Sequence, residues 1–250
     1  MKFTHKLRRH IIQLAALVLL LLPVFFLDTF WFGTYISADL LGVAITDPLT
    51  ALEITLASRS LWLPLLLSAV PLTLTAVLLG RVFCSYICPL NFLLELIPVK
   101  KRRPLRSRAL PFAALGITLL LSLVLALPVF NIVSPVFAFM RLLVFGIGLE
   151  LVLVVLVLAA ALLWGQKIWC RTLCPLGAIY GLLGAKRRLV VQLDESRCLH
   201  CGKCSAACTM GTEPGRTELL ERSTCTNCGD CIDACGEQAL SYSFQGKHKK

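Results

Sequence analysis

Eight of the 12 cysteines in this chain of 250 residues lie between positions 198 and 235, and their spacing strongly constrains the local fold. They form two runs of the pattern Cys-x2-Cys-x2-Cys-x3-Cys, in the segments CLHCGKCSAAC and CTNCGDCIDAC. Short Cys-x2-Cys steps on a tight loop let three thiolates bind one iron–sulfur cube, and a fourth thiolate arrives from a distance. The two runs therefore predict a small ferredoxin-like module, residues 191–250, that holds two [4Fe–4S] clusters.

The assignment of cysteines to clusters follows the rule for two-cluster ferredoxins, in which the fourth cysteine of each run binds the other cluster. The predicted ligand sets are Cys198, Cys201, Cys204 and Cys235 for one cluster, and Cys225, Cys228, Cys231 and Cys208 for the other. Zinc ribbons pair two Cys-x2-Cys steps per metal and do not need the triple step. Thr209 and Gly236 stand where a proline usually follows the fourth cysteine, which affects the turn after each run more than it affects ligation.

Four apolar runs precede this module, at about residues 11–30, 61–80, 109–130 and 142–164. The chain is 57% hydrophobic and 16% charged, with a mean hydropathy of +0.80. A bilayer-spanning helix needs about 20 apolar residues. The sequence therefore predicts an all-α polytopic membrane protein with four transmembrane helices in residues 1–190. A cleaved signal peptide is the alternative for the first run, but no small-residue cleavage site follows it.

The net charge of +11 is distributed by segment, which argues against a nucleic-acid-binding surface. Basic residues gather before the first run, between the second and third runs, and after the fourth, whereas the two remaining connections contain only Arg59 and Arg141. By the positive-inside rule, we expect a multi-pass protein of the bacterial inner membrane, with both termini and the ferredoxin module on the cytoplasmic side. Such a reducing location also argues against a disulfide framework.

The chain repeats a second cysteine motif, in RVFCSYICPLN and KIWCRTLCPLG, each time after an apolar run. The segments DPLTA and SPVFA precede the two motifs at nearly the same distance, so the repeat units extend over about residues 11–91 and 109–177. Two two-helix units related by a pseudo-twofold axis would bring the motifs together. We therefore predict one redox-linked site with four candidate catalytic residues, Cys84, Cys88, Cys170 and Cys174.

Three chemistries remain open for this four-cysteine site. Its thiols could hold a metal ion or an additional cluster, act as redox-active dithiols, or pack as small hydrophobic side chains. Pro89 and Pro175 cannot donate the N–H that a continuing helix needs, so each fixes where a helix ends or turns. Glu150, near the start of the fourth run, is a candidate proton acceptor, and pairing with Arg141 is its alternative role.

The paired Cys-x3-Cys-Pro motifs and the two ferredoxin runs, including WCRTLCPLGAIYGLLG and CLHCGKCSAAC, resemble the NapH family of ferredoxin-type proteins. NosR, MauN-type and CcoG-type proteins share some of these motifs. The resemblance implies a quinol dehydrogenase component that passes electrons from the quinone pool to a periplasmic NapG-like iron–sulfur protein and then to a reductase, such as nitrate reductase. A CcoG-like assembly factor that reduces a metal for a membrane oxidase is the alternative. Asn91 stands where the second motif has Gly177, so the two halves differ.

Overall fold

The computed structural model of the chain describes residues 4–25, 31–33, 37–40, 43–97, 109–146, 148–215 and 218–244. The first unit contains α1 (His5–Phe25), β1 (Trp31–Gly33), β2 (Ser37–Leu40), β3 (Val43–Thr46), α2 (Pro48–Ser58), α3 (Leu63–Leu79), α4 (Val82–Tyr86) and α5 (Pro89–Leu96). The second unit contains α6 (Leu110–Leu125), α7 (Val129–Val133), α8 (Pro135–Phe145), α9 (Glu150–Trp164), α10 (Ile168–Thr172) and α11 (Pro175–Leu183).

The repeat in the sequence reappears as a repeated order of helices. Asp47 and Ser134 are equivalent N-caps: Asp47 Oδ2 accepts from Leu49 N at 2.8 Å, and Ser134 Oγ accepts from Val136 N at 3.2 Å. A proline at the first helical position follows each cap, where its fixed φ favours the helix start. Cys-Pro pairs begin α5 and α11 in the same way. Proline and a polar cap thus set the helix boundaries in both units.

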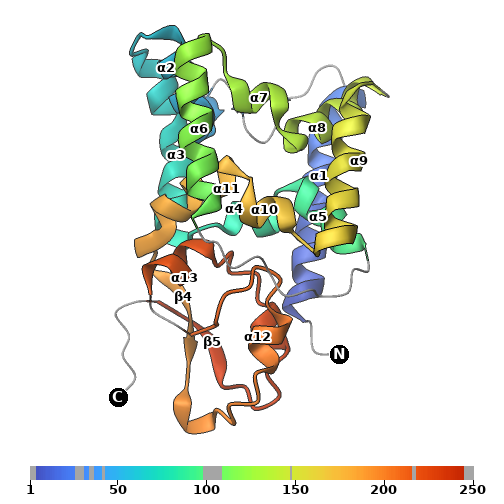
Figure 1. Cartoon of the computed structure of the whole chain (residues 1–250), viewed down its shortest axis with the longest axis vertical. Coiled ribbons are helices and arrows are strands. Elements are labelled where there is room, and N and C mark those ends of the chain that lie inside the picture. The colour runs from blue at the N-terminus through green and yellow to red at the C-terminus, as the bar shows by residue number, and fades with distance from the viewer. Residues whose placement is uncertain are drawn as a thin grey trace.

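The two units exchange helices. Figure 1 shows one upright group made of α2, α3 and α6 and a second made of α1, α8 and α9, with α7 joining them at the top. Each group therefore combines the first long helix of one unit with two helices of the other. Between the groups, α11 packs against α2, α3 and α6, while α5 packs against α8 and α1. This exchange places α4 and α10, which carry the Cys-x3-Cys motifs, near the centre of the helical part.

None of the helices in the described ranges combines the length and apolar character that crossing a bilayer requires. The helices α3, α6 and α9 have 17, 16 and 15 residues, fewer than the roughly 20 that span the hydrocarbon. The apolar run at 109–130 ends as a helix at Leu125, and the run at 142–164 is divided at Gly146, which has a φ of 86°. The predictions of four transmembrane helices and of a multi-pass inner-membrane location are therefore wrong.

The argument from charge also fails for a physical reason. The basic residues on which that prediction rests include Arg9, Arg81 and Lys167, which are only 1%, 4% and 1% exposed. They are held inside the protein by internal partners described below, so their positions in the sequence carry no information about which side of a bilayer they face. The segment KKRRPLRS, residues 100–107, lies outside the described residues.

The C-terminal module lies below the helices in Figure 1. It contains the 3-10 helices η1 (Gly184–Lys186) and η2 (Glu195–Arg197), the strands β4 (Leu189–Leu193) and β5 (Leu240–Phe244), and the helices α12 (Lys203–Ala207), α13 (Leu219–Thr224) and α14 (Asp230–Asp233). The strands pair antiparallel, with Leu189 opposite Phe244 and Leu193 opposite Leu240. One strand precedes the first cysteine run and the other follows the second, so their pairing closes the module. In residues 1–190, the antiparallel β1–β2–β3 sheet corrects the all-α prediction.

Candidate functional site

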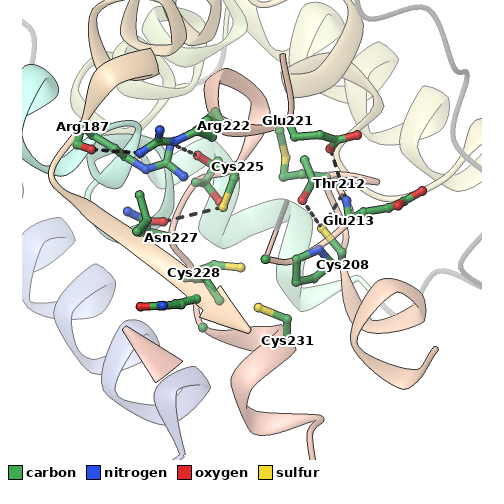
Figure 2. Close-up of a pocket in the computed structure, with 18 of the residues that line it drawn as sticks. Arg187, Cys208, Thr212, Glu213, Glu221, Arg222, Cys225, Asn227, Cys228 and Cys231 are labelled. Atoms are coloured by element: carbon green, nitrogen blue, oxygen red, sulfur yellow. Dashed lines mark hydrogen bonds between the residues drawn. The ribbon is translucent and has the colours of Figure 1, made fainter. Parts of the chain in front are cut away.

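The C-terminal module contains a cavity of about 210 Å³, shown in Figure 2. Four of the predicted ligands line it: Cys208, Cys225, Cys228 and Cys231. The second run supplies three of these thiols, and Cys208 comes from the first run. The structure therefore brings together the four cysteines that the ferredoxin rule assigns to one cluster, including the one that is remote in sequence.

The surroundings of this cavity suit an anionic group. Burial raises the pKa of the Cys228 thiol to about 12, so in the protein alone this sulfur keeps its proton until a metal replaces it. Arg187, which is 2% exposed, lines the same cavity and donates to the Cys225 carbonyl at 3.3 Å. Thr212 N donates to Cys208 Sγ at 3.4 Å. Four sulfur donors, a buried cation and a backbone donor fit a [4Fe–4S] cluster, whose core carries negative charge on its thiolate ligands.

The other predicted set is more open. Cys201 is exposed, and Cys198, Cys204 and Cys235 are half-buried. His200, between the first two cysteines of the run, places Nδ1 3.9 Å from Cys198 Sγ and donates its backbone N–H to that sulfur at 3.4 Å. Within the described ranges, no group of three or more His, Cys, Asp or Glu side chains is arranged to hold a single metal ion. The assignment of this set to a cluster stays a prediction.

The cysteines of the two Cys-x3-Cys-Pro motifs meet in the helical part. Cys84, Cys88, Cys170 and Cys174 all line one cavity of about 20 Å³, which is little more than the 10–15 Å³ that one water needs. Burial raises the pKa of all four thiols, that of Cys170 to about 11, so at neutral pH they are protonated. The four sulfurs provide the donor set of a cluster, but the side chains would have to move apart to admit one. The cavity of the four-cysteine site is therefore too small for a cluster in this arrangement.

Two buried cations flank the four-cysteine site at equivalent positions. Arg81 and Lys167 each stand three residues before the first cysteine of their motif. Arg81 lines the cavity, lowers the pKa of Cys84 against the larger effect of burial, and donates to the Cys170 carbonyl at 3.4 Å. Its other terminal nitrogen donates to the carbonyls of Ser223 and Thr224, both at 3.3 Å. Because Thr224 precedes Cys225, Arg81 connects the four-cysteine site to the cavity of the module.

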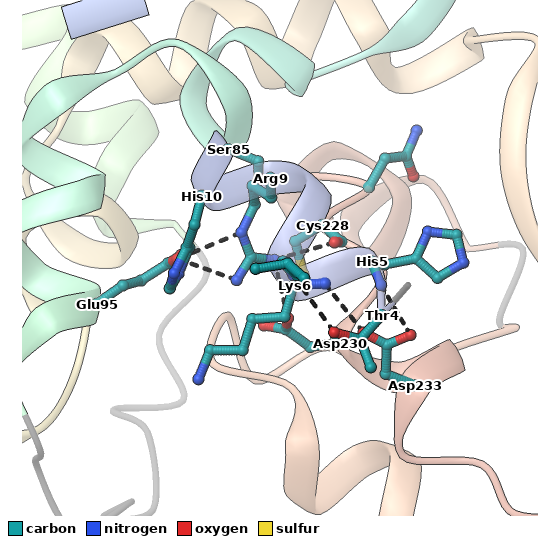
Figure 3. Close-up of polar contacts among 12 residues, drawn as sticks. Thr4, His5, Lys6, Arg9, His10, Ser85, Glu95, Cys228, Asp230 and Asp233 are labelled. Carbon is teal, nitrogen blue, oxygen red and sulfur yellow. Dashed lines mark hydrogen bonds and ion pairs between the residues drawn. The ribbon is translucent and has the colours of Figure 1, made fainter. Parts of the chain in front are cut away.

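Figure 3 shows a buried ion network in which Arg9 of α1 lies between Glu95 of α5 and Asp230 of the module. Lys167 joins this network through Glu95. Glu95, 6% exposed in its side chain, accepts from Lys167 Nζ at 2.7 Å and from Arg9 Nη2 at 2.9 Å. Arg9 Nη1 donates to Asp230 Oδ1 at 2.8 Å and to the Cys228 carbonyl at 2.9 Å. The lysine and arginine lower the pKa of Glu95, although burial alone would raise it. The network fixes the second cysteine run against the helices.

Sequence reasoning missed several of these residues. Arg9, Glu95 and Lys167 come from distant parts of the chain, and each resembles an ordinary charged residue beside an apolar run. Glu150 forms an ion pair with Arg141, with Oε1 3.3 Å from Nε, and both side chains are about one-third exposed. The structure therefore shows Glu150 in the alternative role, which is pairing with Arg141. Asp47 and Glu53, 1% and 0% exposed, are buried carboxylates that the sequence analysis missed, and their position in an otherwise apolar repeat was the available signal.

Iron–sulfur families match the sequence over both cysteine sites. A family described as a 4Fe-4S dicluster domain matches residues 190–236. A family described as a 4Fe-4S binding domain matches twice, at residues 61–106 and 147–192. The double match covers the two Cys-x3-Cys-Pro motifs and gives independent support for the repeat. The fold and the sites therefore define an iron–sulfur electron-transfer protein of ferredoxin type.

Similarity to individual proteins identifies the family within this class. The ferredoxin-type protein NapH of Haemophilus influenzae is 33% identical over 210 residues, which cover 80% of this chain and 73% of the relative. NapH of Escherichia coli is 34% identical, covering 73% and 69%. The methylamine utilization ferredoxin-type protein MauN of Paracoccus denitrificans is 33% identical, covering 70% of this chain and 65% of its own length. The chain belongs to the NapH/MauN family of ferredoxin-type proteins, which confirms the predicted resemblance. No solved structure matches.

Iron and sulfide analysis tests the two ligand sets directly. We expect anaerobically prepared protein to contain about eight iron and eight acid-labile sulfide per chain in the module, because each [4Fe–4S] cluster contributes four of each. Cys231→Ser should halve this content, since Cys231 lines the described cavity. Stoichiometric zinc with negligible sulfide would contradict the prediction.

Proposed function

We propose that this chain is a quinol dehydrogenase component that passes electrons through its iron–sulfur centres to a NapG-like iron–sulfur protein and a periplasmic reductase. The likeness to NapH over 80% of the chain supports this role. MauN, a methylamine utilization protein, is also 33% identical, but its match covers 70% of this chain and the NapH match covers 80%. The choice of a NapH-like pathway therefore rests on the longer match. The chain spans 65–73% of these relatives, and their remaining residues have no counterpart in the alignment.

The single observation that carries the proposal is the connection between the two cysteine sites. One guanidinium, that of Arg81, donates to the Cys170 carbonyl and to the Thr224 carbonyl next to Cys225. A cluster in the module would supply one-electron redox chemistry when bound. The protein provides four thiols to hold it, the Arg187 cation to offset its charge, and a buried hydrogen-bonded path toward the four-cysteine site.

Close packing keeps this path short. A Cβ on Gly181 would lie 2.6 Å from the Ser223 carbonyl oxygen, so a larger residue there would push the backbone of the module away. A Cβ on Gly177 would meet Arg81 Nη2, the end of a flexible side chain. The equivalent of Gly177 in the first motif is Asn91, whose amide instead donates to Glu95 Oε1 at 2.9 Å. The two motifs therefore differ at this position in what they contact. Gly177 lies against Arg81, whereas Asn91 contacts Glu95 of the ion network.

A quinol analogue should reduce the clusters of this protein in the presence of its iron–sulfur partner. A quinol releases two electrons, and two one-electron centres in one module accept them stepwise. Stopped-flow absorbance in the cluster bands, recorded anaerobically with menaquinol and ubiquinol analogues, measures the reaction. If clusters reduced by dithionite never exchange electrons with either quinone, the quinol role is wrong while the electron-transfer class stands.

A further inference from the structure

One side chain of the second cysteine run also binds the end of a helix outside the module. Asn227 lies between Cys225 and Cys228 in the sequence, lines the cavity of the module beside them (Figure 2), and is 2% exposed. Its Nδ2 donates to the Leu79 carbonyl of α3 at 3.0 Å and to the Leu189 carbonyl of β4 at 3.1 Å. Both protons of this amide are therefore used, and both acceptors lie outside the cysteine run.

The carboxyl end of α3 needs donors of this kind. The last four carbonyls of an α-helix have no partner within the helix and must find one elsewhere. In α3 the Leu78 carbonyl accepts from Arg188 N at 3.1 Å, and the Leu79 carbonyl accepts from Asn227 Nδ2. Arg188 directly precedes β4 of the module. Two of the four carbonyls at the end of α3 are thus satisfied by donors of the module.

The end of α3 leads directly to the four-cysteine site. Gly80 has a φ of 79°, a conformation that favours glycine, and turns the chain from α3 into Arg81. Arg81 lines the cavity of the four-cysteine site, and Cys84 follows three residues later. Arg187 of the module packs over this turn, because a Cβ on Gly80 would meet the Arg187 Cδ. The helix end that Asn227 binds therefore fixes where the first Cys-x3-Cys-Pro motif begins.

The turn within the cysteine run does not by itself require this asparagine. Asn227 has a φ of 53°, in the left-handed region that asparagine tolerates well. His200 stands at the equivalent place in the first run and has a φ of 50°. The His200 side chain is exposed and contacts Cys198 of its own run. Both runs therefore make the same turn, but their side chains at this position have different partners.

We propose that Asn227 is a positioning residue that holds the second cysteine run against the carboxyl end of α3. Its amide joins the loop that carries Cys225 and Cys228 to the helix that leads to Cys84, so the two cysteine sites keep a fixed relative position. The contact consists of hydrogen bonds from one donor group and involves no change of charge or oxidation state. It rests on the proposed function only in its consequence, which is electron passage between two sites held in this position.

Hydrogen exchange of single backbone amides tests this contact in the full-length, anaerobically prepared protein. Asn227→Gly removes the side-chain amide, whereas glycine accepts the left-handed φ, and the bond of 2.7 Å from Tyr242 O–H to the carbonyl at this position remains. Each neutral hydrogen bond contributes about a factor of five, so losing two should speed the exchange of Arg188 N–H by about 25-fold. Mass spectrometry with electron-transfer fragmentation measures the rate.

A reference amide and two further variants make the test specific. Asp194 N donates to the Ala239 carbonyl at 2.8 Å beyond the other end of β4, so its exchange rate follows the fold of the module and should not change. His200→Gly, the equivalent change in the first run, should leave both rates at their wild-type values. Asn227→Asp keeps the shape of the side chain but turns an acceptor toward two carbonyls, so Arg188 should exchange faster in it than in Asn227→Gly.

Reduction of the clusters separates positioning from a loss of structure. In Asn227→Gly the iron content and the reduction by dithionite should match the wild type, whereas reduction by a quinol analogue should be slower per cluster. If all three fell together, Asn227 would only stabilise the module and the inference would be wrong.

The exchange rates decide the inference independently of electron transfer. Equal exchange of Arg188 in wild type and Asn227→Gly would overturn it, and so would an equal acceleration of Asp194. A wild-type protein that exchanges no electrons with quinol would contradict the proposed function, and the test by hydrogen exchange would still hold.

Discussion

Glu95→Ala should lower the free energy of unfolding by about 3–5 kcal/mol, the usual cost of removing one partner of a buried ion pair. Lys167 would lose a partner at 2.7 Å and Arg9 a partner at 2.9 Å, and both cations are 1% exposed. Because Arg9 also holds the Cys228 carbonyl, the second cysteine run should loosen with the network. Urea denaturation followed by circular dichroism measures the loss.

Glu150→Ala is the matched control. It removes a glutamate from an ion pair that is partly exposed, and such pairs are worth about 0–1 kcal/mol. Equal losses in the two variants would contradict our account of the network. The pKa of Glu95 is lowered in the folded protein, so its contribution is present above its unfolded pKa and disappears as the pH falls through the folded value. The gap between wild type and Glu95→Ala should therefore close in acid.

Replacing any of the four motif cysteines by serine should reduce quinol-dependent electron transfer to the background rate and leave the iron of the module unchanged. Cys84, Cys88, Cys170 and Cys174 line one cavity, so each variant removes a sulfur from the same site. A serine hydroxyl is a harder and less acidic group than a thiol, and it does not replace thiolate chemistry. Iron, sulfide and stopped-flow measurements on the same preparations give both quantities.

Ala178→Ser controls for the hydroxyl that each variant introduces. Ala178 lies on α11, about one helical turn after Cys174, and is 1% exposed. The change therefore adds a buried hydroxyl without removing a thiol. This control should keep wild-type activity. If the four cysteine variants behave like it, these thiols are packing groups that behave as small hydrophobic side chains, and the redox role is wrong.

The sequence alone determined the features that depend on local spacing. Cysteine spacing identified the ferredoxin module, because a cluster is bound by residues on one tight loop and one further thiolate. The repeated motif and the Pro turns predicted the equivalence of α2 with α8 and of α5 with α11, since proline and its cap act within one turn of helix. They also indicated that the four motif cysteines meet, because a symmetric arrangement places equivalent segments together.

Tertiary structure decided whatever depends on continuity and on contacts between distant residues. Hydropathy reports how apolar a segment is, but not whether its helix continues, and Gly146 divides the run from which a single span was predicted. Arg9, Glu95, Lys167 and Asp230 meet only after folding, because the free energy of a buried charge depends on its partner and not on its sequence neighbours. Asp47 has the same short-range pattern as Ser134, and only the approach of Tyr180 from α11 distinguishes a buried carboxylate from a helix cap.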